Sequence, residues 1–211
     1  GFDLFLNGDV EDLLRAPYER IREAWKGIYS VFDLFTDGTS LKKIFGNHDI
    51  WHLWISVRDM LYDHYEALRL RTSEGTLFLY HGHQASRFVE RMYPLQEFML
   101  NRVANPVRIK NPSLKLERDD VRTKERRIMA HSAMRGVLSL VAHTHRLSFG
   151  GLFGGMYNSG CSTGKKGITA LEIEDGRLSL VHWWDRKILG RHVAPAMIDS
   201  MDLGGADGYR V

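Results

Sequence analysis

Gly46-Asn47-His48-Asp49 is the stretch that decides the fold, because it places an amide, an imidazole and a carboxylate directly after a predicted strand. The preceding run, residues 42–45, is short and partly apolar, as strands are. Polar residues at that point project from the end of a sheet rather than into its core, and open α/β sheets bind ligands at the carboxyl ends of their strands. The stretch therefore predicts an α/β fold with a functional site at a sheet edge.

Three further strand-like runs end in the same way. Residues 5–8 lead to Asp9, residues 77–80 lead to His81-Gly82-His83, and residues 137–142 lead to His143-Thr144-His145. The four runs together are expected to deliver an aspartate, an asparagine and several histidines to one edge.

Composition limits the class of protein. A chain of 211 residues is long enough for one α/β domain with a substantial core. The net charge of +3, from 29 basic and 26 acidic side chains, is compatible with an anionic substrate and does not by itself indicate nucleic acid. A single cysteine, Cys161, excludes an internal disulfide and favours a reducing compartment. No apolar run approaches the ~20 residues of a membrane span, so we expect a cytoplasmic protein, or one peripheral to a membrane.

Periodicity predicts the other elements. Apolar residues three to four apart predict a helix over residues 12–35, which Pro17 is expected to divide, and another over residues 55–68. Residues 70–72 read as a short strand. Residues 168–173 and 177–184 flank Glu174-Asp175-Gly176, which predicts a β-hairpin, and residues 186–211 show no clear pattern.

A long segment, residues 84–137, separates two of the predicted strands and exceeds the dozen or so residues that a crossover needs. It carries an apolar helical stripe and a run of basic residues that includes Arg122 and Arg126. We interpret it as an inserted helical cap in which these two arginines bind substrate. The alternative is an ordinary solvated face, which is typical of basic residues that alternate with acidic ones.

Read in order, the motifs Gly-Asp, Gly-Asn-His-Asp, His-Gly-His and Ala-His-Thr-His resemble those of the calcineurin-like metallophosphoesterase superfamily. The resemblance covers roughly residues 2–184. It implies a single domain over residues 1–211, built as a β-sandwich flanked by helices in an α/β/β/α order.

The resemblance also implies a metal site. Asp9 would bridge two divalent ions, since a carboxylate has two oxygens, and the mixture of imidazole and oxygen donors favours Mn²⁺, with Fe²⁺, Zn²⁺, Co²⁺ or Ni²⁺ as alternatives. The other implied ligands are Asn47, His81 and His143 for one ion and His145 for the second. Because His143 and His145 lie two positions apart, the chain has to bend there for the two rings to reach different ions.

His48 is the implied proton donor, oriented by Asp49, because a catalytic histidine needs a partner that fixes its tautomer. Asp12 and His83 are implied to lie in the shell of residues around the metal ligands and to support those ligands. Arg146 is expected to bind a phosphate oxygen.

One part of the family pattern is missing. The family opens with Asp-x-His on a first strand, upstream of Gly-Asp, and residues 1–7 contain no such motif. Without it the second ion would keep only Asp9 and His145 among the implied ligands. We expect a segment upstream of Gly1 to carry the motif, rather than a one-metal variant.

The expected function is metal-dependent hydrolysis of a phosphomonoester, phosphodiester or pyrophosphate bond by an activated water. The partner would be a phosphorylated small-molecule or amphiphilic substrate, since the cap layout is similar to that of the UDP-2,3-diacylglucosamine pyrophosphatases. The Ser/Thr protein phosphatase branch is disfavoured, because Gly46-Asn47-His48 ends here in Asp49 rather than Glu.

Two alternatives stay open. A non-catalytic scaffold of the same fold, as one retromer subunit is, would have no need to keep the metal-type residues. A nuclease would want aromatics among its basic residues, and residues 110–127 contain none. Fold-level likeness does not settle the substrate.

Overall fold

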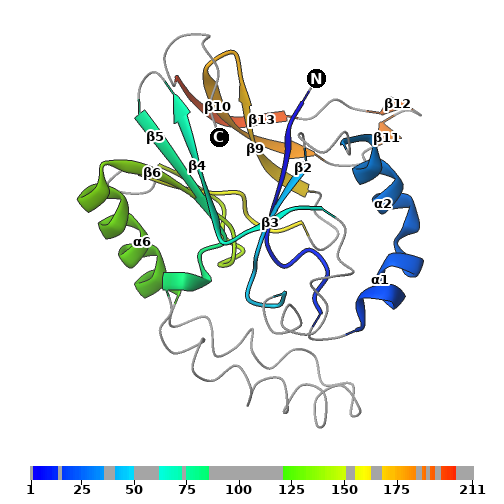
Figure 1. The fold of residues 1–211 in the computed structure, drawn as a ribbon. Helices are drawn as coiled ribbons and strands as arrows, with labels where there is room; N and C mark the ends of the chain where they lie inside the picture. Colours follow the sequence, from blue (N-terminus) through cyan, green and yellow to red (C-terminus); the bar gives the residue numbers. More distant parts are fainter. Residues whose placement is uncertain are drawn as a thin grey trace. The chain divides into compact units, whose positions relative to one another are not determined.

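A computed structural model gives the fold of the chain (Figure 1). It describes residues 2–13, 16–35, 41–49, 62–72, 75–85, 121–150, 155–162, 168–183, 187–188, 191–192 and 196–202. The chain divides into two compact units. Unit 1 comprises Gly1–Ala67 and Tyr80–Lys124, and unit 2 comprises Leu68–Leu79 and Glu125–Val211.

Unit 1 contains a parallel sheet in the order β1 (Leu4–Asn7), β2 (Leu41–Ile44), β3 (His64–Tyr65). β1 and β2 pair from Leu4 opposite Leu41 to Asn7 opposite Ile44. Because the two strands are parallel and in register, their carboxyl ends share one edge. The Gly8-Asp9 and Gly46-Asn47 motifs therefore start side by side, as the sequence predicts.

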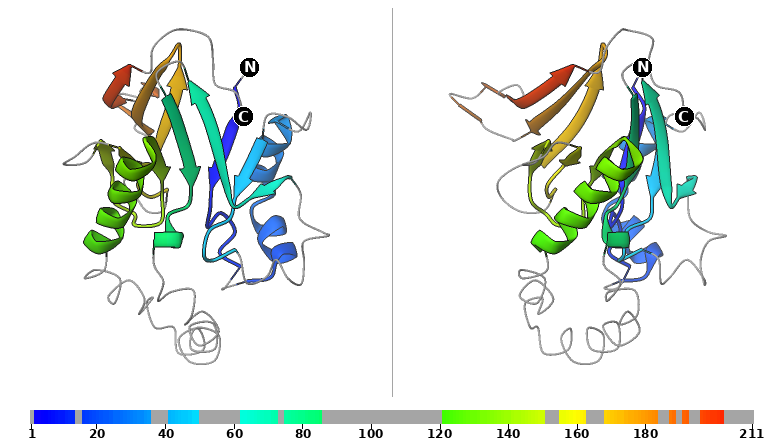
Figure 2. Two further views of the ribbon diagram at one scale, coloured as in Figure 1. Left: turned by 60° about the vertical axis from the view of Figure 1, so that its left-hand side comes forward. Right: turned by 90° about the vertical axis from the view of Figure 1, so that its left-hand side faces the viewer.

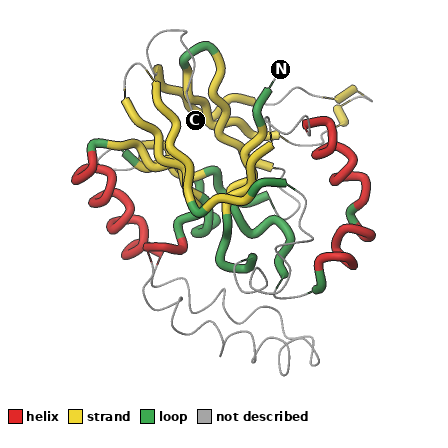
Figure 3. Tube along the Cα trace, viewed as in Figure 1, coloured by secondary structure: helices red, strands yellow, loops and turns green. Residues whose placement is uncertain are grey.

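Two helices follow β1 in unit 1, α1 (Tyr18–Ala24) and α2 (Lys26–Phe32), with the short 3₁₀ turn η1 (Asp33–Phe35) (Figure 3). The predicted helical periodicity is confirmed, but the division falls at Trp25 and not at Pro17. Pro17 stands just before α1, where its lack of an N–H costs nothing. Tyr18 of α1 and Tyr29 of α2 form a buried cluster with Leu13 of the preceding loop.

The predicted helix over residues 55–68 is wrong in the part that the structure describes. Residues 64–65 form β3, and β4 runs from Ala67 to Thr72. The cause is alternation: Leu68 and Leu70 are buried while Arg69 and Arg71 are exposed, which is the two-residue period of a strand. Residues 50–61 lie outside the described residues.

Unit 2 contains a mixed sheet in the order β4-β5-β6-β8-β7. Its further strands are β5 (Gly75–Tyr80), β6 (Val137–Val141), β7 (Ser148–Gly150) and β8 (Met156–Asn158). β6 is parallel to both β5 and β8, whereas β7 is antiparallel to β8. The predicted α/β class is thus confirmed, and the sheet of unit 2 is mixed.

The helix α6 (Val121–Arg135) connects β5 to β6 and packs on the sheet of unit 2 (Figure 2). Ile128 is buried, the Ser132 hydroxyl lies 2.6 Å from the Ser139 hydroxyl of β6, and the His131 ring lies 6.0 Å from that of Phe78 on β5. This is how a crossover helix between parallel strands packs.

The predicted cap, residues 84–137, is described only at its two ends, by η3 (His83–Ala85) and by α6. Arg122 and Arg126 lie on α6 and are exposed. Residues 86–120 lie outside the described residues. None of the described helices has the length and apolar character that crossing a membrane requires.

An antiparallel sheet completes unit 2, with β10 (Arg177–Trp183) between β9 (Ile168–Glu174) and β13 (Ala196–Asp202). The predicted hairpin is confirmed: Asp175 and Gly176 both have left-handed φ, 47° and 73°, as a tight two-residue turn requires. Two short strands, β11 (Lys187–Ile188) and β12 (Arg191–His192), pair in the region where the sequence shows no pattern.

Candidate metal centre

The loop after β1 turns back sharply at Gly8-Asp9. Both residues have left-handed φ, 80° and 54°. A Cβ on Gly8 would lie 2.3 Å from Nδ1 of His81, so only glycine lets the chain pass this close to the imidazole. The turn brings the Asp9 carboxylate to the loop after β2.

Asp9 and Asp49 tie the two loops together reciprocally. The Asp49 Oδ2 accepts hydrogen bonds from the backbone N–H of Asp9 at 2.8 Å and of Gly46 at 3.1 Å. In return, Asp9 Oδ1 accepts one from the backbone N–H of His48 at 2.8 Å. Burial raises the pKa of Asp49 to about 6, as do the nearby charges of Asp9 and Glu11. These bonds fix where both carboxylates and the His48 backbone lie.

His48 is oriented by Asp12 and not by Asp49, which corrects the expectation from the sequence. The His48 Nδ1 lies 2.7 Å from Asp12 Oδ1, whereas the Asp49 Oδ2 accepts hydrogen bonds from the backbone N–H groups of Asp9 and Gly46. Burial lowers the pKa of His48, but the bond to Asp12 and the charge of Asp9 outweigh it and raise the pKa to about 9. The ring is therefore protonated at neutral pH and able to donate a proton.

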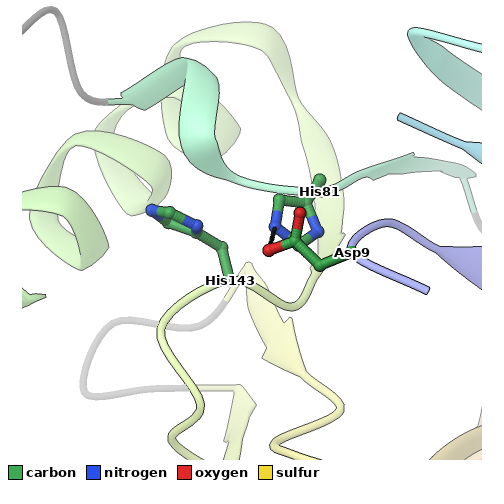
Figure 4. A group of neighbouring side chains, drawn as sticks. All are labelled: Asp9, His81 and His143. Carbon is green, nitrogen blue, oxygen red and sulfur yellow. Dashed lines mark ion pairs between the residues drawn. The ribbon is translucent and has the colours of Figure 1, made fainter. Parts of the chain in front are cut away.

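His81 is 1% exposed, and each of its two ring nitrogens lies close to an oxygen atom. Figure 4 shows the ring beside Asp9. Its Nδ1 lies 2.7 Å from the backbone oxygen of Asn7, and its Nε2 lies 3.0 Å from Asp9 Oδ2. A carbonyl oxygen can only accept, so Nδ1 carries the hydrogen and Nε2 faces the carboxylate. Metal-binding histidines are commonly held in this way, with the second nitrogen donating to a carbonyl.

Asp9 and His81 change each other's pKa. Burial lowers the pKa of His81, but the charge of Asp9 reverses the effect and raises it. Burial raises the pKa of Asp9, and the charges of His81 and His48 together lower it below its ordinary value. The pair belongs to the group of side chains that could hold a metal ion.

Asn47 supplies the test of whether these residues fit a metal. Its side chain is 4% exposed, and within the described part of the chain no group hydrogen-bonds its Oδ1. A buried amide oxygen without a hydrogen bond is costly unless another group, such as a cation, satisfies it. Carboxylate, amide oxygen and imidazole together form a donor set that suits Mn²⁺ and its neighbours in the first transition series. The residues therefore fit a divalent ion.

His83 lies beside His81, with the two ring centroids 5.6 Å apart. Burial, together with the nearby charge of His81, lowers the pKa of His83 to about 4. A neutral ring therefore lies beside His81, and the supporting role of His83 stays a prediction.

In unit 2, His143 and His145 follow β6, and both have a left-handed φ of 55°. The bend that their spacing requires is therefore present. Figure 4 also draws His143, which is buried, whereas His145 is exposed.

Asn158, at the end of β8, holds this histidine loop. Its Nδ2 donates to the Ala142 carbonyl at 2.8 Å and to the Thr144 hydroxyl at 2.9 Å, and its Oδ1 accepts from the Gly160 backbone at 2.9 Å. Sequence reasoning missed Asn158. The available signal is an asparagine at a strand end followed closely by glycine.

Arg146 is the remaining predicted site residue. Its Nη1 lies 3.4 Å from Oε2 of Glu125, and the arginine side chain is 56% exposed. Its substrate-binding role stays a prediction, as do those of Arg122 and Arg126.

Sequence reasoning also missed Glu11 and Lys43, which are buried beside the site. The signal is the position of Lys43: it is two residues from Leu41, so it shares the buried face of a strand. A lysine in that position predicts a buried acidic partner.

Comparison with known proteins returns structural similarity only. No family model and no curated protein matches the sequence. A Vps29 single mutant from Entamoeba histolytica has 13% identity and a TM-score of 0.45, with 96% of this chain and 83% of that chain covered. Vacuolar protein sorting 29 from Cryptosporidium parvum has 15% identity and a TM-score of 0.44, covering 95% and 98%.

A third structure, a conserved uncharacterized protein and predicted phosphoesterase from Streptococcus pneumoniae, has 14% identity and a TM-score of 0.37, covering 92% and 81%. Likeness at this level does not establish a shared function. The function has to be inferred from the residues of the site.

The approach of the two loops predicts a strict need for glycine at position 46. A Cβ on Gly46 would lie 2.0 Å from Asp9 Oδ1 and 2.2 Å from the Asp9 backbone nitrogen, so the backbone of one loop has to move. We expect Gly46→Ala to lower the free energy of unfolding by about 1–3 kcal/mol, measured by thermal or urea denaturation.

The matched control is Gly27→Ala on α2, where a Cβ would meet nothing within 4 Å. Alanine is the better helix former, so this change should leave stability equal or raise it by up to ~1 kcal/mol. Equal stability of the two variants would show that the loops do not need this close approach.

Proposed function

We propose that this protein is a metal-dependent phosphoesterase related to the calcineurin-like metallophosphoesterases. The observation that carries the proposal is the set of Asp9, which is partly buried, with the buried Asn47 and His81. In this set the Asn47 Oδ1 has no hydrogen-bond partner among the described residues, and the His81 Nε2 faces a carboxylate. A hydrolase that uses bound divalent ions has a use for such a set, whereas a purely structural site would leave the amide unsatisfied.

We propose that Asp9, Asn47, His81 and His143 hold one ion and that Asp9 and His145 contribute to a second. The chemistry of Asp9, His81 and His143 suits a metal. The pairing of β5 with β6 also supports this ligand set, because Leu79 stands opposite Leu140 in a parallel ladder and the residues that follow both strands leave the same sheet edge. Mn²⁺ matches the mixture of donors best, with Fe²⁺, Zn²⁺, Co²⁺ or Ni²⁺ as alternatives.

When bound, the ions would lower the pKa of a water and neutralise charge on the phosphoryl oxygens. The protein's own residues supply the remaining step. His48 is protonated at neutral pH and its Nδ1–H is directed to Asp12, so its Nε2–H is the proton that it can give to the leaving oxygen. Asp49 holds the backbone of Asp9 and Gly46, and Asp9 in turn holds the backbone of His48.

The substrate is proposed to be a phosphorylated small molecule or amphiphile that contains a phosphomonoester, phosphodiester or pyrophosphate bond. Residues 84–137 would form a cap that selects it, with Arg122, Arg126 and Arg146 as anion-binding residues, and the protein would act in the cytoplasm or at a membrane surface. A scaffold without activity remains the competing function. Measured metal binding and turnover separate the two.

The first test of the proposal is metal-dependent turnover. We expect the full chain to hydrolyse an aryl phosphate or a bis-aryl phosphodiester after chelation and add-back of Mn²⁺, because the donor set retains that class of ion. Activity that survives complete chelation would overturn the proposal. So would an absence of activity with Mn²⁺, Co²⁺, Ni²⁺, Zn²⁺ and Fe²⁺ alike.

The second test separates a ligand from a proton donor. Asn47→Ala should lower the metal content of the purified protein, whereas His48→Ala should keep the metal and lower kcat by roughly 10²- to 10⁴-fold. His182→Ala on β10 is the control, with metal content and kcat unchanged. Elemental analysis and steady-state kinetics give both readouts, and loss of metal in His48→Ala would show that His48 is a ligand.

A further inference from the structure

A buried charge cluster lies next to the candidate metal centre in unit 1. Lys43 is 2% exposed and Glu11 is 4% exposed, and the Lys43 ammonium forms an ion pair with Glu11 Oε1. The Tyr29 hydroxyl donates a hydrogen bond of 3.0 Å to the same oxygen. The three residues come from different elements: Glu11 from the loop after β1, Lys43 from β2 and Tyr29 from α2.

Stability alone gives a poor reason for this cluster. Removing two charges from water costs more than their attraction commonly returns, and apolar side chains of similar size pack in such places at least as well. Glu11 is also incompletely satisfied, because within the described ranges no donor reaches its Oε2. Because burying Glu11 and Lys43 costs stability, the pair needs a role other than stabilisation. The position of Glu11 in the chain suggests one.

Glu11 sits in the middle of the loop that carries the site. Only Val10 separates it from Asp9, and Asp12, the partner of His48, follows it directly. Asp9 and Asp12 both have left-handed φ, 54° and 47°, a conformation that non-glycine residues hold only when their surroundings impose it.

Lys43 is anchored on the central strand of the sheet. It stands opposite Leu6 of β1 and His64 of β3 in the parallel ladders. An ammonium fixed to this strand, together with a tyrosine of α2, can hold Glu11 in one place. Glu11 in turn restrains the residues on both sides of it.

We propose that Glu11, Lys43 and Tyr29 are positioning residues that hold the Asp9–Asp12 loop in its metal-binding conformation. The Lys43 ammonium also offsets negative charge where Asp9, Glu11, Asp12 and Asp49 gather, so that the loop is formed before an ion binds. The metal part of this inference rests on the proposed function. The conformational part does not.

The decisive variant is Glu11→Leu/Lys43→Met, which removes both charges and leaves apolar side chains of similar size, a change that buried ion pairs tolerate. We expect the protein to stay folded by circular dichroism. The Asp9 backbone amide donates to Asp49 and the His48 backbone amide donates to Asp9. Without metal, both amides should exchange with deuterium faster in the double variant than in the wild type. The Kd for Mn²⁺ in calorimetry should rise roughly 10- to 100-fold.

Tyr29→Phe keeps the test usable if the double variant does not fold. It removes one hydroxyl from Glu11. The matched control is Tyr62→Phe, which removes a hydroxyl that donates to the exposed Asp33 at 2.9 Å, outside the cluster. We expect faster exchange at Asp9 and His48 in Tyr29→Phe only.

The outcomes distinguish a positioning role of the cluster from a purely structural role. The inference would be overturned if a folded double variant exchanged the amides of Asp9 and His48 at the wild-type rate. Equal exchange rates in Tyr29→Phe and Tyr62→Phe would also overturn it. If the wild type binds no Mn²⁺ and the exchange still accelerates as expected, the cluster positions the loop but the proposed function fails.

Discussion

The reciprocal hydrogen bonds between the loops after β1 and β2 are the constraint on which the site depends. Each loop supplies a carboxylate to the backbone of the other: Asp49 accepts from Asp9, and Asp9 accepts from His48. The arrangement is possible only because β1 and β2 are parallel neighbours and because Gly46 leaves room for Asp9. The remaining groups of unit 1 are placed relative to this junction.

Charge explains how the junction of the two loops could hold a cation. The carboxylates of Asp9, Glu11, Asp12 and Asp49 gather within a few residues of the two loops. Their charges are compensated by Lys43 and by His48 and His81, whose pKa values are raised above the ordinary histidine value. A bound divalent ion would take over the compensation of Asp9 from His81, whose Nε2 would then be a ligand instead of a donor.

The sequence predicts the strands that carry the site because each is a short apolar run followed at once by polar, metal-type residues. It does not predict that Asp12 rather than Asp49 faces His48, since the two partners lie 36 residues apart and their contact depends on the left-handed turn at Asp12. It misses Lys43 and Glu11 because lysine and glutamate are usually read as surface residues. β3 and the first two residues of β4 are misread because Tyr65 and Leu68 also fit a helical spacing, whereas the strand predicted at residues 70–72 is confirmed.

Anomalous diffraction from Mn²⁺-soaked crystals, recorded near the manganese absorption edge, tests the central claim most directly. We expect an anomalous peak bonded to a carboxylate oxygen of Asp9, to Asn47 Oδ1 and to His81 Nε2, with the His81 Nδ1 still bonded to the Asn7 carbonyl. A well-ordered site without an anomalous peak, or a peak bound elsewhere while Asn47 Oδ1 stays without a ligand, would contradict it.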